Sequence, residues 1–203
     1  LKHRLRDAGA DALLVTNPRD IRYLTGFVGD DSWALVPLSP KVNKLWLLSD
    51  FRFREQIGRE APHAVAVMRK KGLAEELEKL AKKSKLRKLA LQSAHVSLSL
   101  HKKLKKQLGG KKLLAVDDEL IEQRAVKHPD EARAIHKALE IQQAAFRELR
   151  EFIEPGMTEA ELAAFLEYRM RSLGADGSSF PTIVAADANA ALPHAIPGDR
   201  RVK

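Results

Sequence analysis

Cysteine is absent from this sequence of 203 residues. Disulfide bonds, thiolate zinc sites and cysteine nucleophiles are therefore excluded together. The absence also fits a reducing compartment, and we expect a cytoplasmic protein. No apolar run reaches the roughly 18 residues that suggest a membrane-spanning helix, and the first residues lack the apolar core of a secretory signal. Hydrophobic residues still make up 44% of the chain, so we expect a packed core.

Aromatic residues are scarce, at 5%, and acidic residues are outnumbered, with 27 of them against 36 lysines and arginines. Residues 69–112 contain 15 basic and 3 acidic residues, a net charge of +12, and no aromatic residue; the rest of the chain has a net charge of −3. Without aromatic rings this block offers no platform for stacking bases. Its lysines alternate with leucines, which is typical of solvated faces of amphipathic helices. We therefore predict an exposed basic surface and do not expect nucleic acid as a partner.

Short apolar runs alternate with helical patterns up to about residue 116. Strands are expected at residues 12–16, 33–38, 44–48, 64–68, 86–91 and 113–116. Helices are expected from Pro18 to Gly26, from Asp50 to Glu60, and over residues 73–83 and 96–108. The second and third strands are expected to form a hairpin through Pro40, Val42 and Asn43. This alternation predicts an α/β domain with a mixed sheet.

The pattern changes near residue 120. A short helix over residues 118–125 is followed by a break at Pro129, and then by long helices expected at residues 130–153 and from Thr158 to Gly174. Thr158 and Glu161 form the capping box of the latter. A strand is expected at residues 180–185 and a polar loop at residues 187–198. We predict a domain over residues 1–122, a linker over residues 123–130, and the start of a second domain over residues 131–203.

Three groups of residues form an ordered set. The first is residues 21–27 with the acidic tip 29–32, and the second is residues 49–56, directly after a strand. The third is spread along the second half of the chain, in segments 124–131, 155–159, 180–184 and 189–197. The set resembles the Xaa-Pro aminopeptidase, prolidase and creatinase family. The resemblance covers nearly the whole chain.

The resemblance implies a creatinase-like N-terminal domain followed by a pita-bread α+β domain. It implies a peptidase that removes the residue before a proline in the second position of a peptide, either an Xaa-Pro aminopeptidase or an Xaa-Pro dipeptidase. It also implies a homo-oligomer and two divalent ions (Mn, Co or Zn) held by two Asp, one His and two Glu. Those ligands follow the segment at which this chain stops, so we expect an incomplete pita-bread domain, no metal on this chain, and no activity from it alone.

His194 is the candidate catalytic residue that the resemblance implies, beside the metals and not a ligand to them. A neutral imidazole can donate its N–H to a substrate carbonyl or an oxyanion. The alternative is a loop histidine that caps local backbone. The family pattern often has Gly where Asp187 stands, and Asp tolerates a positive φ less well than Gly, so the backbone conformation of this loop stays open.

Arg52 is a candidate substrate-binding residue, because it follows a strand end and guanidinium can bind a carboxylate with two hydrogen bonds. The alternative is an ion pair with Asp50 or Glu55. Phe27 and Asp31 are candidates on a loop that could overhang the same pocket, although Asp31 could instead serve the turn itself.

The remaining aromatic residues and histidines show no sign of a catalytic or metal-binding role. Tyr23 and Trp33 are expected in the core. The remaining histidines show no H-E-x-x-H spacing, and no nucleophile elbow or phosphate loop is present. Two other functions stay open: creatinase-type hydrolysis of a C–N bond, and a non-catalytic binding protein with the same fold.

Overall fold

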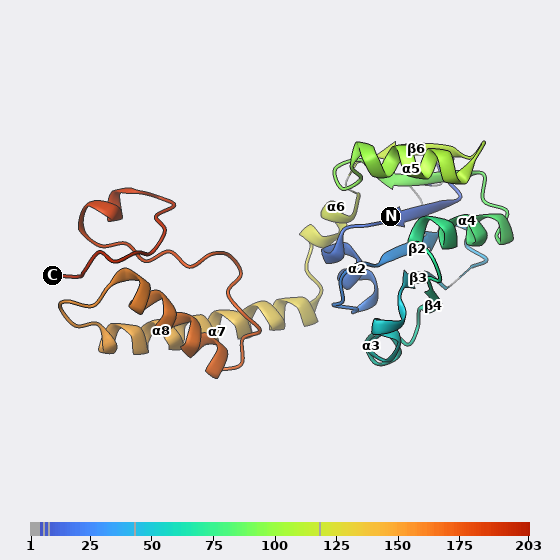
Figure 1. The fold of residues 1–203 in the computed structure, drawn as a ribbon. Helices are drawn as coiled ribbons and strands as arrows, with labels where there is room; N and C mark the ends of the chain where they lie inside the picture. The colour runs from blue at the N-terminus through green and yellow to red at the C-terminus, as the bar shows by residue number, and fades with distance from the viewer. Residues whose placement is uncertain (1–4, 6, 8, 43, 118) are drawn as a thin grey trace. The chain divides into compact units, whose positions relative to one another are not determined.

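The computed structural model describes residues 5, 7, 9–42, 44–117 and 119–203 (Figure 1). The chain divides into two compact units, residues 1–126 and 127–203, and each is described by itself. Asn43 of the predicted hairpin and Asp118 of the predicted short helix lie outside the described residues.

The first unit contains a six-stranded mixed sheet in the order β4-β3-β2-β1-β5-β6. β1 pairs antiparallel with β2, and β2 pairs antiparallel with β3, whereas β3–β4, β1–β5 and β5–β6 are parallel pairs. The strands are β1 (Ala12–Val15), β2 (Trp33–Pro37), β3 (Trp46–Ser49), β4 (Val65–Met68), β5 (Lys88–Gln92) and β6 (Lys112–Val116). The predicted α/β domain with a mixed sheet is confirmed.

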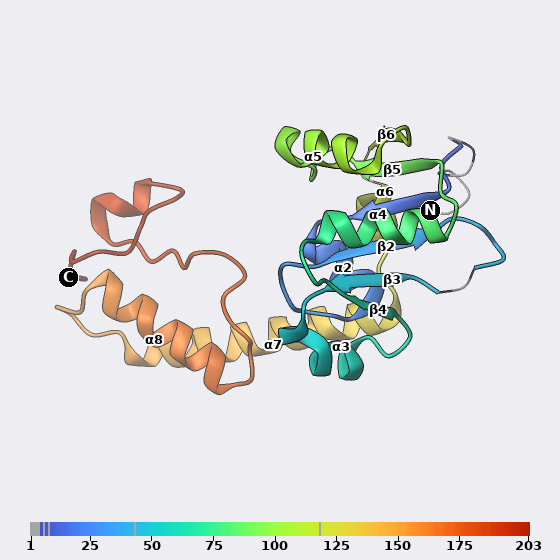
Figure 2. The same cartoon turned by 45° about the vertical axis from the view of Figure 1, so that its right-hand side comes forward.

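Helices cover both faces of this sheet (Figures 1 and 2). One face carries α2 (Pro18–Thr25), α3 (Arg54–Glu60), which follows the 3-10 turn η1 (Phe51–Phe53), and α6 (Glu119–Ala125). The other carries α4 (Leu73–Lys83) and α5 (Leu98–Leu108). Two parallel strands that follow one another in the chain need a crossover connection. This explains α3, which joins β3 to β4, and α5, which joins β5 to β6.

The strand sequences are apolar on both sides because both faces are covered. Leu13 of β1 belongs to the core beneath α2 and α3, whereas Leu14, the next residue, belongs to the core beneath α4 and α5. Both side chains are at most 1% exposed. Tyr23 and Trp33 are partly buried and pack against these two cores, as expected for core aromatics.

α2 shows why its local sequence forms a helix with these ends. The side chain of Asn17 accepts a hydrogen bond from the backbone N–H of Arg19, and Pro18 occupies the first turn. Gly26 ends the helix in the left-handed conformation, at φ 80°, and its N–H donates to the carbonyl of Arg22.

A buried carboxylate fastens α6 to the rest of the first unit. Asp20 is 0% exposed and accepts hydrogen bonds from Gln92 at 2.7 Å and from the guanidinium of Arg124 at 2.8 Å. Arg124 lies inside the stretch predicted as the linker, and this ion pair attaches it to the sheet side of α2.

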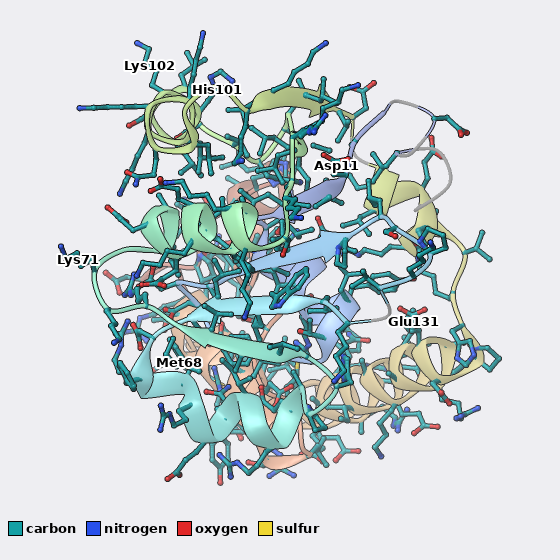
Figure 3. All side chains as sticks on the ribbon, turned by 90° about the vertical axis from the view of Figure 1, so that its right-hand side faces the viewer. Asp11, Met68, Lys71, His101, Lys102 and Glu131 are labelled. Carbon is teal, nitrogen blue, oxygen red and sulfur yellow. The ribbon has the colours of Figure 1, made fainter. Side chains whose placement is uncertain are left out.

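The basic block of residues 69–112 forms a solvated surface over α4, α5 and the strands beside them. Along α5, Lys102, Lys103, Lys105 and Lys106 are exposed, whereas Leu104 is 0% exposed. Lys102 projects outward from the helix (Figure 3). The amphipathic pattern expected here is confirmed for α5.

The second unit is built on two packed helices, α7 (Pro129–Phe152) and α8 (Glu159–Ser172). Ile141, Ala145 and Leu149 form the buried stripe of α7. Phe152 stacks on Phe165 of α8, with ring centroids 3.9 Å apart and planes at 3°. Both helices begin with capping boxes, which include the one predicted at Thr158.

The predicted strand at residues 180–185 is wrong, because this segment is irregular in the structure. A strand exists only when a neighbouring strand supplies a ladder of hydrogen bonds. Within the described residues of the second unit, the one bridge of that kind joins Thr158 to Arg201. The loop that follows contains a short 3-10 helix, η2 (Asp187–Ala191).

Candidate functional site

Four charged side chains meet where β3 and β4 end. These strands are parallel and Ser49 pairs with Met68, so Asp50 and Arg69, the next residues, emerge together. The carboxylate of Asp50 accepts hydrogen bonds from Arg52, at 2.7 Å from Nη2, and from Arg69, at 2.8 Å. Asp31 joins the cluster, with Arg69 at 2.5 Å and Arg52 at 3.4 Å. Two guanidinium groups thus balance two carboxylates.

The hydrogen bonds of the cluster favour the charged forms of Asp50, Arg52 and Arg69. Hydrogen bonds from Arg52 hold the pKa of the Asp50 carboxyl well below its usual range. The bond to Asp50 raises the pKa of Arg52, and the bond to Asp31 raises the pKa of Arg69. The Arg52 side chain remains 67% exposed. The structure therefore shows the ion pair with Asp50 that we considered, and leaves the guanidinium accessible, so substrate contact by Arg52 stays a prediction.

Phe27 is buried and does not lie on the surface beside this cluster. Its ring is 0% exposed and meets Phe53 edge to face, with centroids 5.6 Å apart. The guanidinium of Arg52 lies 5.4 Å from the centroid of the same Phe53 ring. Burial argues against direct ligand contact by Phe27, because an enclosed ring presents no surface to a ligand. Phe27 instead packs on Phe53, the ring that the Arg52 guanidinium approaches.

Asp31 adopts the left-handed conformation, at φ 45°, in the loop before β2. Its side chain is 46% exposed while it pairs with Arg69. Asp is one of the few residues other than Gly that enter this conformation readily. The structure brings Asp31 and Arg52 together as predicted neighbours, and their role toward a substrate stays a prediction.

His194 belongs to the second unit and lies in the loop that leaves η2. Its side chain is exposed, and the next residue, Ala195, is 6% exposed. The N–H of Ala195 donates to the carbonyl of Leu192, so the chain turns at His194. The imidazole of His194 therefore faces solvent, on a turn whose next residue, Ala195, is buried.

The base of this loop closes on a carboxylate that we did not predict. Glu159, the first residue of α8, is 0% exposed. It accepts hydrogen bonds from the N–H of Ala186 at 2.7 Å, the side-chain amide of Asn189 at 3.0 Å, and the N–H of Gly198 at 3.1 Å. The bond from Ala186, together with those from Asn189 and Gly198, lowers the pKa of Glu159 despite its burial.

Asp187 adopts a positive φ at the position where the family pattern often has Gly. Its φ is 49°. The carboxylate of Asp187 also pairs with Lys203 at 3.3 Å, on the exposed side of the loop.

Side chains able to ligate a metal do not gather in the part of the chain that the structure describes. Nowhere in residues 5, 7, 9–42, 44–117 and 119–203 do three or more His, Asp or Glu side chains lie so that they could hold a metal ion. The residues present therefore do not fit a metal centre by themselves. Among the same residues, no helix combines the length and the apolarity that crossing a bilayer requires.

Two family models account for the two units. The Creatinase/Prolidase N-terminal domain matches residues 1–126, and metallopeptidase family M24 matches residues 133–203. The first match covers more than half of the chain, so the chain belongs to the creatinase/prolidase family. The resemblance carried by the three groups of residues is confirmed.

Several solved structures with this fold are named as peptidases that act at proline. The X-Pro aminopeptidase from Thermotoga maritima is 36% identical, with a TM-score of 0.88 over the whole chain. The Xaa-Pro dipeptidase from Bacillus anthracis is 28% identical, with a TM-score of 0.90. An uncharacterized peptidase of Bacillus subtilis is 26% identical over 203 residues.

The chain spans little more than half the length of these proteins. It covers 57% of each of the two solved chains and 56% of the Bacillus subtilis peptidase. The fold class, an α/β creatinase-like N-terminal domain followed by part of a pita-bread domain, is confirmed.

Sequence reasoning missed two residues that organise these sites, Arg69 and Glu159. Arg69 follows a predicted strand just as Arg52 does, so the same argument could have found it. Glu159 gives no comparable signal, because its partners lie 27 to 39 residues further along the chain.

Proposed function

We propose that the complete protein is a metal-dependent peptidase that cleaves the bond before a proline in the second position of a peptide, as an Xaa-Pro aminopeptidase or an Xaa-Pro dipeptidase. The observation that carries this proposal is the joint match to the creatinase/prolidase N-terminal domain and to metallopeptidase family M24. The names of the similar solved structures support the proline specificity.

His194 is the catalytic residue of this proposal. Its imidazole N–H donates a hydrogen bond to the carbonyl oxygen of the residue before proline, and holds it as negative charge develops there. The exposed position of His194, on a loop fastened to α8, supports this role.

Arg52 and Asp31 bind the substrate in this proposal, and Phe27 supports them through its packing on Phe53. The accessible guanidinium of Arg52 suits a peptide carboxylate, which would replace part of its bonding to Asp50 and Asp31. Asp31 faces the same guanidinium and orients it. The family resemblance, in which such an arginine reaches the pocket of a neighbouring subunit, supports a homo-oligomer.

The cofactor of the complete protein is a pair of divalent ions, Mn, Co or Zn. Membership of the metallopeptidase family supports them, and the described residues hold no group that would ligate them. We therefore propose that their ligands belong to parts of the protein beyond these 203 residues. The absence of cysteine supports a cytoplasmic location.

A peptide assay on the full-length protein tests the reaction. The protein is treated with EDTA, dialysed, and supplied with Mn²⁺, Co²⁺ or Zn²⁺ before release of alanine is measured. We expect metal to restore cleavage of Ala-Pro or Ala-Pro-Ala while Ala-Ala and Ala-Ala-Ala stay intact, and the 203-residue chain to cleave none of them. Cleavage of Ala-Pro alone identifies a dipeptidase, and cleavage of longer peptides an aminopeptidase. Failure to cleave any proline peptide with all three metals contradicts the proposal.

The same assay tests substrate binding. Replacing Arg52 by Ala should raise KM with little change in kcat, since the lost hydrogen bonds hold the substrate and not the transition state. The matched control is Arg54→Ala, because Arg54 lies two residues away and stacks on Phe51. Equal KM values for the two variants would remove Arg52 from the proposed site.

A further inference from the structure

Glu159 stands out among the residues to which no function has yet been given. It is a fully buried carboxylate at the first position of a helix, and buried acidic side chains require hydrogen-bond partners. Each of its oxygens is used: Oε1 accepts from Ala186 and Asn189, and Oε2 accepts from Asn189 and Gly198. All three donors come from one loop.

The three donors are placed at both ends and in the interior of that loop. Ala186 begins the segment that contains His194, Asn189 lies within η2, and Gly198 ends it. A single side chain therefore closes a loop of 13 residues at its base. Hydrogen bonds inside the loop join residues three apart, such as Leu192 to Asn189, so they bend the loop without joining it to α8.

Backbone contacts fix the other partner, α8, to the last residue of the loop and to the segment after it. The N–H of Glu159 itself donates to the carbonyl of Arg200 at 2.9 Å, and the N–H of Ala160 donates to the carbonyl of Gly198 at 3.0 Å. The carboxylate of Glu159 is thus held at a defined place by its own backbone. The N-terminal end of the α8 dipole favours its negative charge there.

We infer that Glu159 is the positioning residue that sets the conformation of the loop of residues 186–198 and so the place of the His194 imidazole. The effect on catalysis rests on the proposed function of His194, whereas the closing of the loop does not. Glu159 touches no reacting atom in this proposal and acts through the loop.

Glu159→Gln is the direct test, because it keeps the shape and removes the charge. One carboxylate oxygen becomes an amide N–H₂, which cannot accept from a backbone N–H, so at least one donor loses its partner. The matched control is Glu161→Gln. Glu161 lies in the same helical turn, is exposed, and accepts from Thr158, outside the loop.

Hydrogen exchange of the full-length protein reports the loop without any assay of activity. We expect residues 186–198 to exchange roughly tenfold faster or more in Glu159→Gln, while α7 keeps its protection. Glu161→Gln should leave the loop unchanged. Unchanged exchange of the loop in Glu159→Gln overturns the inference.

Asn189→Ala decides the case in which Glu159→Gln loosens the whole unit. This variant removes one donor and leaves both backbone donors and the carboxylate in place. Faster exchange confined to residues 186–198 supports the inference, and protection of the loop equal to wild type overturns it.

A double-mutant comparison tests whether Glu159 acts through His194. Glu159→Gln should lower kcat roughly 10- to 100-fold with little change in KM, since a displaced catalytic group costs rate. In a His194→Ala background the same change should have no further effect on kcat, whereas an equal further loss overturns the positioning role. If His194→Ala alone leaves kcat unchanged, the proposed role of His194 fails, and the exchange experiment still decides whether Glu159 closes the loop.

Discussion

Gly29 shows how one residue without a side chain shapes the loop before β2. A Cβ built on Gly29 would lie 2.2 Å from Cζ of Phe27, well inside contact distance. The Phe27 ring cannot move aside easily, because it is 0% exposed and packed on Phe53. The loop that carries Asp31 therefore follows the surface of a buried ring.

Gly29→Ala should destabilise the first unit by about 1–3 kcal/mol, because the added methyl group overpacks the site. Gly58→Ala is the matched control. Gly58 lies inside α3 with no atom within 4 Å of the position of its Cβ, so alanine should stabilise the unit by about 0.5–1 kcal/mol. Urea unfolding followed by tryptophan fluorescence measures both, since Trp33 and Trp46 lie in this unit. Equal effects of the two changes would contradict the packing argument.

At the scale of elements, the ionised side chain of Glu159 joins the first turn of α8 to the loop of residues 186–198. Hydrogen bonds from Ala186, Asn189 and Gly198 hold its pKa below the ordinary value of 4.5, and the charge of Arg200 adds to this. A folded pKa below the unfolded value means that the ionised form contributes stability above the unfolded pKa. That contribution is lost as pH falls through the folded pKa.

Wild type should therefore be more stable than Glu159→Gln, and the difference in their free energies of unfolding should be at its full size above about pH 5. This difference should shrink as pH falls below the ordinary Glu pKa. Thermal unfolding of both proteins between about pH 7 and pH 3 measures this difference. Other carboxylates titrate in both proteins and cancel in the comparison. A difference that stays constant over this range would show that the charge of Glu159 does not stabilise the fold.

Elements with complete local signals could be predicted almost to the residue. α4 spans Leu73–Lys83, the predicted range, and α2 ends at Gly26 because a left-handed residue is needed there. The strand expected at residues 180–185 failed since pairing depends on a distant partner that composition does not reveal. The sequence alone left the backbone conformation at Asp187 open, and only the structure shows its positive φ.

Some residues of the candidate site could likewise be predicted from the sequence, and others could not. Strand ends could be located, so Asp50 and Arg52 were found together. Phe27 was placed on an overhanging loop because its sequence neighbours are turn residues, yet packing against Phe53 buries it. Glu159 depends on contacts up to 39 residues away, which helix periodicity does not contain.

At the scale of the whole molecule, a net charge of +9 comes from one block of sequence. The lysines of α5 form the solvated face of an amphipathic helix. Surface charge of this kind governs solubility and weak attraction to polyanions, and is screened by salt.

The full-length protein should pass through heparin or DNA columns at about 150 mM salt, because a basic surface without aromatic residues binds a polyanion only weakly at that ionic strength. Replacement of Lys102 and Lys105 by Glu should then leave peptide cleavage unchanged. Retention well above that salt concentration, lost in the double variant, would favour the binding-protein alternative.

In the proposed function, His194 of the complete protein acts on peptides with proline in the second position. The most direct measurement is kcat for the preferred proline peptide in wild type, in His194→Ala, and in His136→Ala, whose histidine is exposed on α7. We predict that His194→Ala lowers kcat roughly 100- to 1,000-fold, the cost of losing one hydrogen-bond donor to an oxyanion, and that His136→Ala changes nothing. Equal rates in all three proteins would contradict the account.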